Sequence, residues 1–166
     1  MRVLVTAASK HGATLEVADA IADRLAAQGM DVVQRLPADV TALDEFDAVI
    51  LGSAVYAGRW LDAARRFVDR LGAELRDLPV WLFSSGPLGD PLKPEQDPID
   101  AAPMLEATDA CGHRIFAGRL DRSRLGFADK AIVVALRAPE GDFRDWDAIH
   151  AWADEISRTL GQHVRS

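Results

Sequence analysis

The stretch RVLVTAASKHGAT, residues 2–14, decides the fold of this chain. Its residues 2–6 form a short, β-branched and almost continuous apolar run, which is typical of a strand buried on both faces of a parallel sheet. From Thr14 onward, apolar residues recur at helical spacing as far as Leu25, and Gly29 follows as a C-terminal stop signal. The stretch therefore predicts a central strand, a loop and a helix in direct succession.

The same alternation continues along the rest of the chain. Strands alternating with helices imply right-handed crossovers, so the sequence predicts an α/β fold in which helices cover both faces of a parallel sheet. Ligands of such sheets bind beyond the carboxyl ends of the strands. Residues 125–137 fit a strand or a helix equally well by periodicity alone. We expect further strands at residues 31–35 (an edge strand), 48–52, 79–83 and 113–117, and further helices at residues 60–71 (closed by Gly72), 99–108 and 145–160 (capped by Asp142).

The bulk composition narrows the class of protein. A chain of 166 residues is expected to form one domain, residues 1–166, and the formal net charge of -7 argues against binding nucleic acid. The single cysteine, Cys111, forms no internal disulfide, and no signal-peptide pattern is visible, so we expect a cytoplasmic protein. The longest apolar run, residues 131–136, is too short to span a bilayer, so we expect no transmembrane segment and at most peripheral membrane contact.

The first loop, Ser9-Lys10-His11-Gly12-Ala13-Thr14, has a composition that suits an anion. Ser9 and Thr14 offer hydroxyl donors, Gly12 permits close approach of the backbone, and the first amides of the following helix are unpaired. A terminal phosphate group would complete this set. The loop matches neither the Walker pattern nor the dinucleotide pattern, and ordinary helix capping by Ser9 or Thr14 is the alternative interpretation.

Two more loops lie at the predicted carboxyl edge of the sheet. Tyr56 and Trp60 belong to the loop after the third strand, where aromatic side chains can enclose a planar ring, although core packing explains Trp60 equally well. Backbone groups near Ala57 and Gly58 suit the polar edge of an isoalloxazine. Residues 84–89, after the fourth strand, can close over the other side of such a ring, or form a simple turn.

These residues resemble those of a known family. The first loop resembles the phosphate loop of flavodoxins, from which His11 departs, and residues 50–59 are similar to flavodoxin-like menaquinone-dependent protoporphyrinogen dehydrogenases. The similarity covers nearly the whole chain, including residues 116–120 and 141–146. That branch has a helical insertion between these two pieces, which implies an insertion at about residues 121–140 and a helix at residues 125–137. The resemblance implies a five-stranded parallel sheet with strand order 2-1-3-4-5.

The resemblance also implies a function. Noncovalent FMN would pass electrons to a quinone or a redox partner protein, with a small-molecule substrate such as a porphyrinogen as one option. No catalytic side chain and no metal ligand is assigned. Ala7, Ala8 and His11 motivate an alternative, a flavodoxin-like interaction or scaffold module without cofactor. The residues implied to bind the cofactor are Ser9, Lys10, His11, Gly12, Ala13, Thr14, Ser53, Ala54, Val55, Tyr56, Ala57, Gly58, Ser85, Gly86, Pro87 and Leu88.

Overall fold

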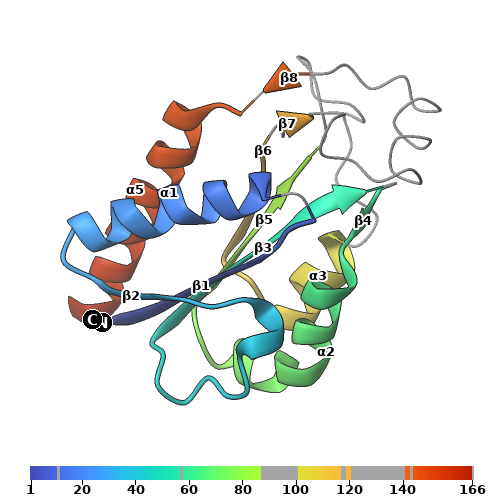
Figure 1. Cartoon of the computed structure of the whole chain (residues 1–166). Helices are drawn as coiled ribbons and strands as arrows, with labels where there is room; N and C mark the ends of the chain where they lie inside the picture. The colour runs from blue at the N-terminus through green and yellow to red at the C-terminus, as the bar shows by residue number, and fades with distance from the viewer. Residues whose placement is uncertain are drawn as a thin grey trace.

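A parallel sheet forms the centre of the molecule. The computed structural model describes residues 1–10, 12–56, 58–86, 101–116, 119–120, 141–142 and 144–165. The parallel strands lie in the order β2-β1-β3-β5-β6 (Figure 1). The α/β class is thus confirmed, and these strands have the predicted order. The strands are β1 (Arg2–Ala8), β2 (Asp31–Gln34), β3 (Ala48–Tyr56), β5 (Val80–Ser85) and β6 (Gly112–Phe116).

One strand of the sheet was not predicted. The two-residue strand β4 (Arg59–Trp60) pairs antiparallel with the end of β3, so the sheet has six strands rather than five. β3 accordingly continues to Tyr56, beyond the predicted end at residue 52. The extension exists because the end of β3 finds its hydrogen-bonding partner in the chain that turns back on it.

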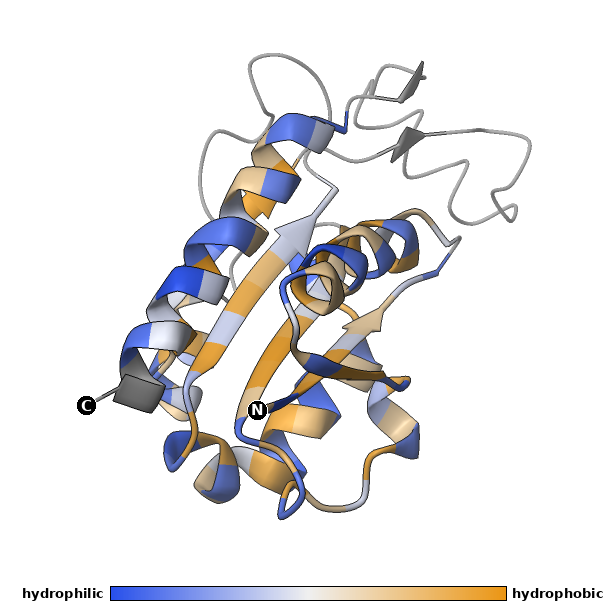
Figure 2. Ribbon diagram, turned by 90° about the vertical axis from the view of Figure 1, so that its left-hand side faces the viewer, coloured by the Kyte–Doolittle hydropathy of each residue, from blue (hydrophilic) through white to orange (hydrophobic). Residues whose placement is uncertain are grey.

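Helices cover both faces of the sheet. α1 (Ala13–Ala27) and α5 (Trp146–Arg165) lie on one face, and α2 (Asp62–Arg76) and α3 (Ala101–Thr108) lie on the other (Figure 1). A short 3-10 helix, Pro37–Asp39, follows β2. Figure 2 shows the central strands mainly in hydrophobic colours, with hydrophilic residues on the outer sides of the helices. This is the layering that alternation of strands and helices predicts.

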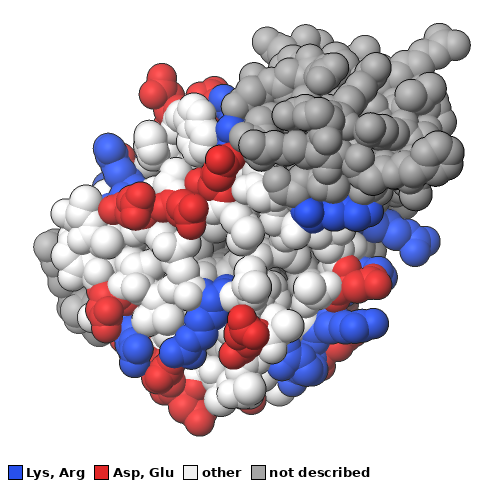
Figure 3. Space-filling view, viewed as in Figure 1, with Lys and Arg blue, Asp and Glu red and all other residues white. Residues whose placement is uncertain are grey.

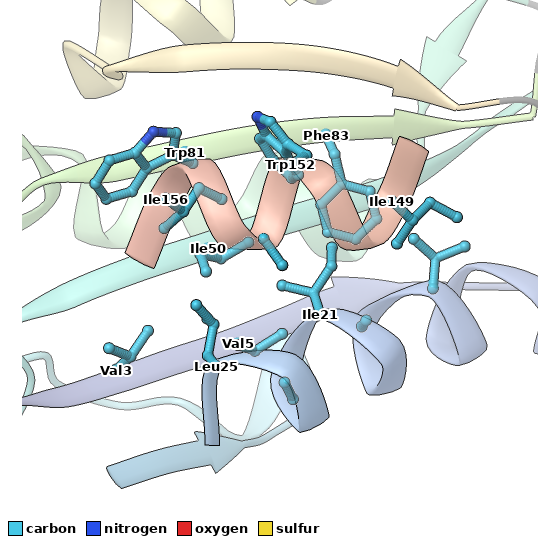
Figure 4. Packing of buried hydrophobic residues seen from close by; sticks show 14 of the residues in the cluster. Val3, Val5, Ile21, Leu25, Ile50, Trp81, Phe83, Ile149, Trp152 and Ile156 are labelled. Atoms are coloured by element: carbon cyan, nitrogen blue, oxygen red, sulfur yellow. The ribbon is translucent and has the colours of Figure 1, made fainter. Parts of the chain in front are cut away.

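The core forms two clusters, one on each face of the sheet. Val3 and Val5 of β1 point to the cluster beneath α1 and α5, where Trp152 packs edge-on against Phe83 (Figure 4). Leu4, the alternate residue, belongs to the cluster beneath α2. Each side of β1 is therefore buried, as its continuous apolar pattern predicts, and this fixes the loop after β1 at the centre of the sheet edge.

The end of α2 differs from the prediction. Gly72 does not close the helix, which continues to Arg76. Leu75 continues the apolar stripe and is completely buried, and this burial outweighs the cost of about 1 kcal/mol for a glycine inside a helix. A side chain at position 72 would also contact the backbone oxygen of Ala107 in α3, at 3.9 Å.

The segment before α5 also differs. Asp142 does not cap α5, because Gly141–Asp142 forms β8 and pairs antiparallel with β7 (Arg119–Leu120). Asp145 is the cap instead, since its Oδ1 accepts the backbone N–H of Ala148 at 3.0 Å. The predicted helical insertion at residues 121–140 lies outside the described residues.

The surface of the described part is mixed in charge. Figure 3 shows Lys and Arg side chains interspersed with Asp and Glu over the visible face. Arg24 of α1, for example, pairs with Asp154 of α5 at 2.9 Å. None of the described helices has the length and apolar character that crossing a membrane requires.

Candidate functional site

The loop after β1 has the backbone geometry of an anion site. Gly12 precedes α1 with φ 91° and ψ -15°, a left-handed conformation, and Ala13 is the first residue of the right-handed helix. A left-handed residue followed by a right-handed one turns successive N–H groups toward one point, which forms a concave anion-binding nest. No side chain within the described residues caps α1. The positive end of the helix dipole thus reinforces the nest.

Ser9 shapes this loop. Its Oγ accepts the backbone N–H of Gly12 at 2.9 Å, so it ties the two ends of the turn together rather than capping the first turn of α1. Thr14 lies inside α1 and is 2% exposed, so it does not cap the helix either. The ordinary capping interpretation of both hydroxyls is therefore wrong. A Cβ added at Gly12 would meet nothing within 4 Å, so open space adjoins the nest.

The second loop is a tight hairpin. Val55 lies opposite Trp60, and Tyr56 opposite Arg59, which leaves a two-residue turn in which Gly58 has φ 74°. A left-handed glycine is what such a turn requires. Ala57 and the side chain of Tyr56 lie outside the described part of the chain. The hairpin projects from the carboxyl end of β3, where the sequence places one side of a ligand site.

Two side chains of the second loop are used inside the protein. Ser53 is completely buried, and its Oγ donates to the Ala54 carbonyl at 2.8 Å and accepts the Leu61 N–H at 3.0 Å. Trp60 is 1% exposed and donates its indole N–H to Ser84 Oγ at 2.8 Å. Trp60 therefore packs in the core, which is one of the two roles that the sequence allows.

The third loop lies directly against the second. Gly86, with φ 130°, donates its N–H to the Phe116 carbonyl at 3.2 Å. A Cβ at Gly86 would lie 3.1 Å from the carbonyl oxygen of Val55, so only glycine allows the two backbones to approach this closely. Register pairs Ala8 with Ser53 and Ala54 with Ser85. The sheet thus brings the starts of all three predicted loops together at one edge.

The protein comparisons agree with this arrangement. A family model described as a flavodoxin domain matches residues 4–147. The chain belongs to the flavodoxin domain family. Membership of this family implies a flavin cofactor. A search of curated proteins found no match for this flavodoxin-domain chain.

Solved structures share the fold of this flavodoxin domain. A flavodoxin from the domain Archaea is 23% identical with a TM-score of 0.58, over 82% of this chain and 98% of that one. Oxidised flavodoxin 1 from Bacillus cereus is 15% identical with a TM-score of 0.65, over 95% and 98%. Rubredoxin oxygen:oxidoreductase from Desulfovibrio gigas is 14% identical with a TM-score of 0.66, over 99% of this chain but only 37% of that one. At these identities the likeness shows the fold alone.

The residues of this flavodoxin domain fit a flavin nucleotide. The uncapped start of α1, beside the left-handed Gly12, would offer its first backbone N–H groups to a phosphate, and the space next to Gly12 is open. Glu16, in the first turn of α1, is the nearest acidic residue in sequence, and its carboxylate pairs with Arg144. The Arg144 guanidinium also lies 4.6 Å from the centre of the Trp146 ring. The negative charge of Glu16 is therefore compensated and does not oppose an anion.

Several predicted site residues lie outside the described part of this flavodoxin domain. Other residues near the site were not predicted from the sequence. His11, Ala57, Pro87 and Leu88 are in the first group. Arg144 was missed because it is 128 residues from its partner Glu16, and no local pattern signals such a pair. His113 was not selected, and Ser84 was considered only as the start of the third loop, although Ser84 Oγ hydrogen-bonds to both His113 and Trp60 behind the second loop. Hydroxyl and imidazole groups in buried strands are the only sequence signal for such a network.

Proposed function

We propose that this chain binds FMN noncovalently and carries electrons through it. The nest at Gly12 is the observation that supports the proposal most strongly, because an uncapped helix start beside a left-handed glycine, with open space around that glycine, is a suitable environment for a terminal phosphate. FMN is favoured over a dinucleotide because the loop lacks the G-x-G-x-x-G pattern of dinucleotide sites. We further propose that residues 1–166 form one domain and act in the cytoplasm.

The protein's contribution is to hold and orient the cofactor. Ser9, Lys10, His11, Gly12, Ala13 and Thr14 would hold the phosphate. The Ser9 hydroxyl keeps its own hydrogen to donate, because its oxygen already accepts from Gly12 and no described acceptor takes that hydrogen. The ring would lie between the second loop (Ser53, Ala54, Val55, Tyr56, Ala57 and Gly58) and the third loop (Ser85, Gly86, Pro87 and Leu88). When bound, FMN supplies the electron-transfer chemistry.

The electron acceptor is proposed to be a quinone or a redox partner protein. The similarity of residues 50–59 to protoporphyrinogen dehydrogenases favours a quinone-linked activity with a porphyrinogen as the small-molecule substrate. An anaerobic assay of the reconstituted protein with protoporphyrinogen and a menaquinone analogue tests this. Oxidation of the porphyrinogen supports the dehydrogenase; activity only in a reductase-coupled cytochrome assay supports an electron carrier instead.

The alternative, an interaction module without cofactor, loses part of its motivation. Ala7 and Ala8 are 1% and 4% exposed and pack into the two core clusters from β1, so they do not line the phosphate loop. Their lack of hydroxyl groups is thus explained by core packing.

The purified protein provides the direct test of cofactor binding. We expect it to be yellow, with about one FMN released per chain, or to quench the fluorescence of added FMN at micromolar concentration. A folded protein that is colourless and leaves FMN fluorescence unchanged at that concentration would eliminate the proposal.

A further inference from the structure

A buried guanidinium lies against the first turn of α1. Arg144, in the segment between β8 and α5, has a side chain that is only 5% exposed, and its Nη1 donates to Oε2 of Glu16. The guanidinium also lies over the ring of Trp146, 4.6 Å from the ring centre. Trp146 in turn packs against the core cluster beneath α1 and α5. The core thus supports one side of Arg144, while the charge of Arg144 is directed at Glu16.

Glu16 is an acidic residue at a helix start that has no side-chain cap. It belongs to the first turn of α1, where the free N–H groups attract negative charge. The start of α5 shows how a carboxylate uses such groups, because Asp145 Oδ1 accepts the Ala148 N–H at 3.0 Å. At α1 no side chain in the described part of the chain does this, and the Glu16 carboxylate accepts from Arg144 instead. The ion pair therefore accompanies an open helix start.

We propose that Arg144 is a positioning residue for anion binding, which draws the Glu16 carboxylate away from the free N–H groups of α1 and offsets its charge. The inference rests on the proposed function in one respect: the anion is taken to be the phosphate of FMN. Without Arg144, the Glu16 carboxylate would repel a phosphate and compete with it for the same N–H groups. The effect acts on the phosphate and not on the flavin ring, so a ligand without phosphate should not sense it.

The first experiment measures the affinity of each variant for FMN and for riboflavin. In Arg144→Gln we expect the Kd for FMN to rise at least about fivefold, and the Kd for riboflavin to change less than about twofold. Glu16→Gln removes the opposing charge, and its amide oxygen can still accept from Arg144, so FMN affinity should stay the same or increase. In the double variant the Kd for FMN should return to within about twofold of the wild type. This double-mutant cycle isolates the coupling between the two side chains, whatever else each of them contacts.

The ion pair of Arg24 and Asp154 provides the matched control. It also joins α1 to α5, at 2.9 Å, but from the last turn of α1. Arg24→Gln removes the same charge from the protein and breaks a bridge to α5, so it should keep the wild-type ratio of FMN to riboflavin affinity. An equal loss of this ratio in Arg24→Gln and Arg144→Gln overturns the inference, because net charge alone would then explain it. So does an Arg144→Gln protein that binds both ligands equally more weakly, or a double variant without recovery, which would mean that Arg144 contacts the ligand itself.

A second experiment does not depend on FMN. Inorganic phosphate, added to the apoprotein at constant ionic strength, should raise the urea midpoint of the wild type more than that of Arg144→Gln. An equal increase in both proteins overturns the inference. If the wild type binds no FMN, the proposed function fails, and the phosphate measurement still decides the role of Arg144. If Arg144→Gln does not fold, Glu16→Gln decides it, because a higher Kd for FMN in that variant contradicts an opposing role of Glu16.

Discussion

Gly12 and Gly29 provide a matched pair of substitutions for the phosphate loop. They flank α1 with nearly the same left-handed backbone, φ 91° and φ 92°, and an added Cβ meets nothing within 4 Å at either position. Gly12→Ala and Gly29→Ala therefore introduce the same backbone strain without a steric clash. α1 spans 15 residues, so the two sites are about 20 Å apart along the helix. Only Gly12 belongs to the proposed site.

The size of the effect follows from the backbone. A left-handed alanine costs about 1–2 kcal/mol, and the lower entropy of the unfolded chain offsets about 0.4–1 kcal/mol of this. Gly29→Ala should thus lower the free energy of unfolding by about 1 kcal/mol and leave FMN affinity unchanged. In Gly12→Ala the loop end can relax out of the left-handed region, and FMN binding must then restore the nest. We expect the Kd for FMN to rise about tenfold, which corresponds to about 1.4 kcal/mol.

The assay combines urea unfolding of both apoproteins with fluorescence titration of FMN. The reasoning about the nest is refuted if Gly12→Ala and Gly29→Ala bind FMN with the same affinity as the wild type. It is refuted equally if both variants lose affinity to the same extent, since the loss would then come from general destabilisation of α1.

Two further predictions concern the scaffold. A Cβ at Gly52 would lie 2.1 Å from the Phe83 ring, so Gly52→Ala should destabilise the protein by about 1–3 kcal/mol in urea unfolding; unchanged stability would show that the Phe83 ring moves aside freely. The hydrogen bond from Arg24 holds the pKa of Asp154 below its ordinary value, so this carboxylate stabilises the fold above the unfolded-state pKa and the contribution is lost as the pH falls through the folded-state pKa. Asp154→Asn should therefore lower the urea midpoint at about pH 7, and the difference from the wild type should shrink as the pH falls through the lowered folded-state pKa of Asp154; a difference that does not shrink in acid would contradict this assignment.

The sequence predicts the fold well because its strands are buried on both faces. The continuous apolar run of β1 and the helical spacing in α1 indicate a central strand of a parallel sheet that is followed by a helix covering one face. The burial of Val3, Leu4 and Val5 agrees with this architecture. The departures involve contacts between distant segments. β4 depends on pairing with β3, and α2 passes through Gly72 because Leu75 finds a buried position. Local propensity contains no information about either.

The candidate site is predictable in its loops and less so in its side chains. Small residues and a glycine between a buried strand and a helix indicate an anion loop, and the left-handed Gly12 agrees with this. The sequence does not reveal that Ser53 and Trp60 turn inward, since their roles depend on Leu61 and Ser84 as partners. The roles of all the proposed cofactor-binding residues stay predictions for experiment.

Comparison of FMN with riboflavin tests the phosphate loop most directly, because the two ligands share the ring and differ in the phosphate. With two or three charge-assisted hydrogen bonds to the backbone near Gly12, we expect riboflavin to bind at least about a hundredfold more weakly than FMN. Inorganic phosphate should compete with FMN but not with riboflavin. Equal affinities for the two ligands would contradict the assignment of the nest after β1 to a phosphate.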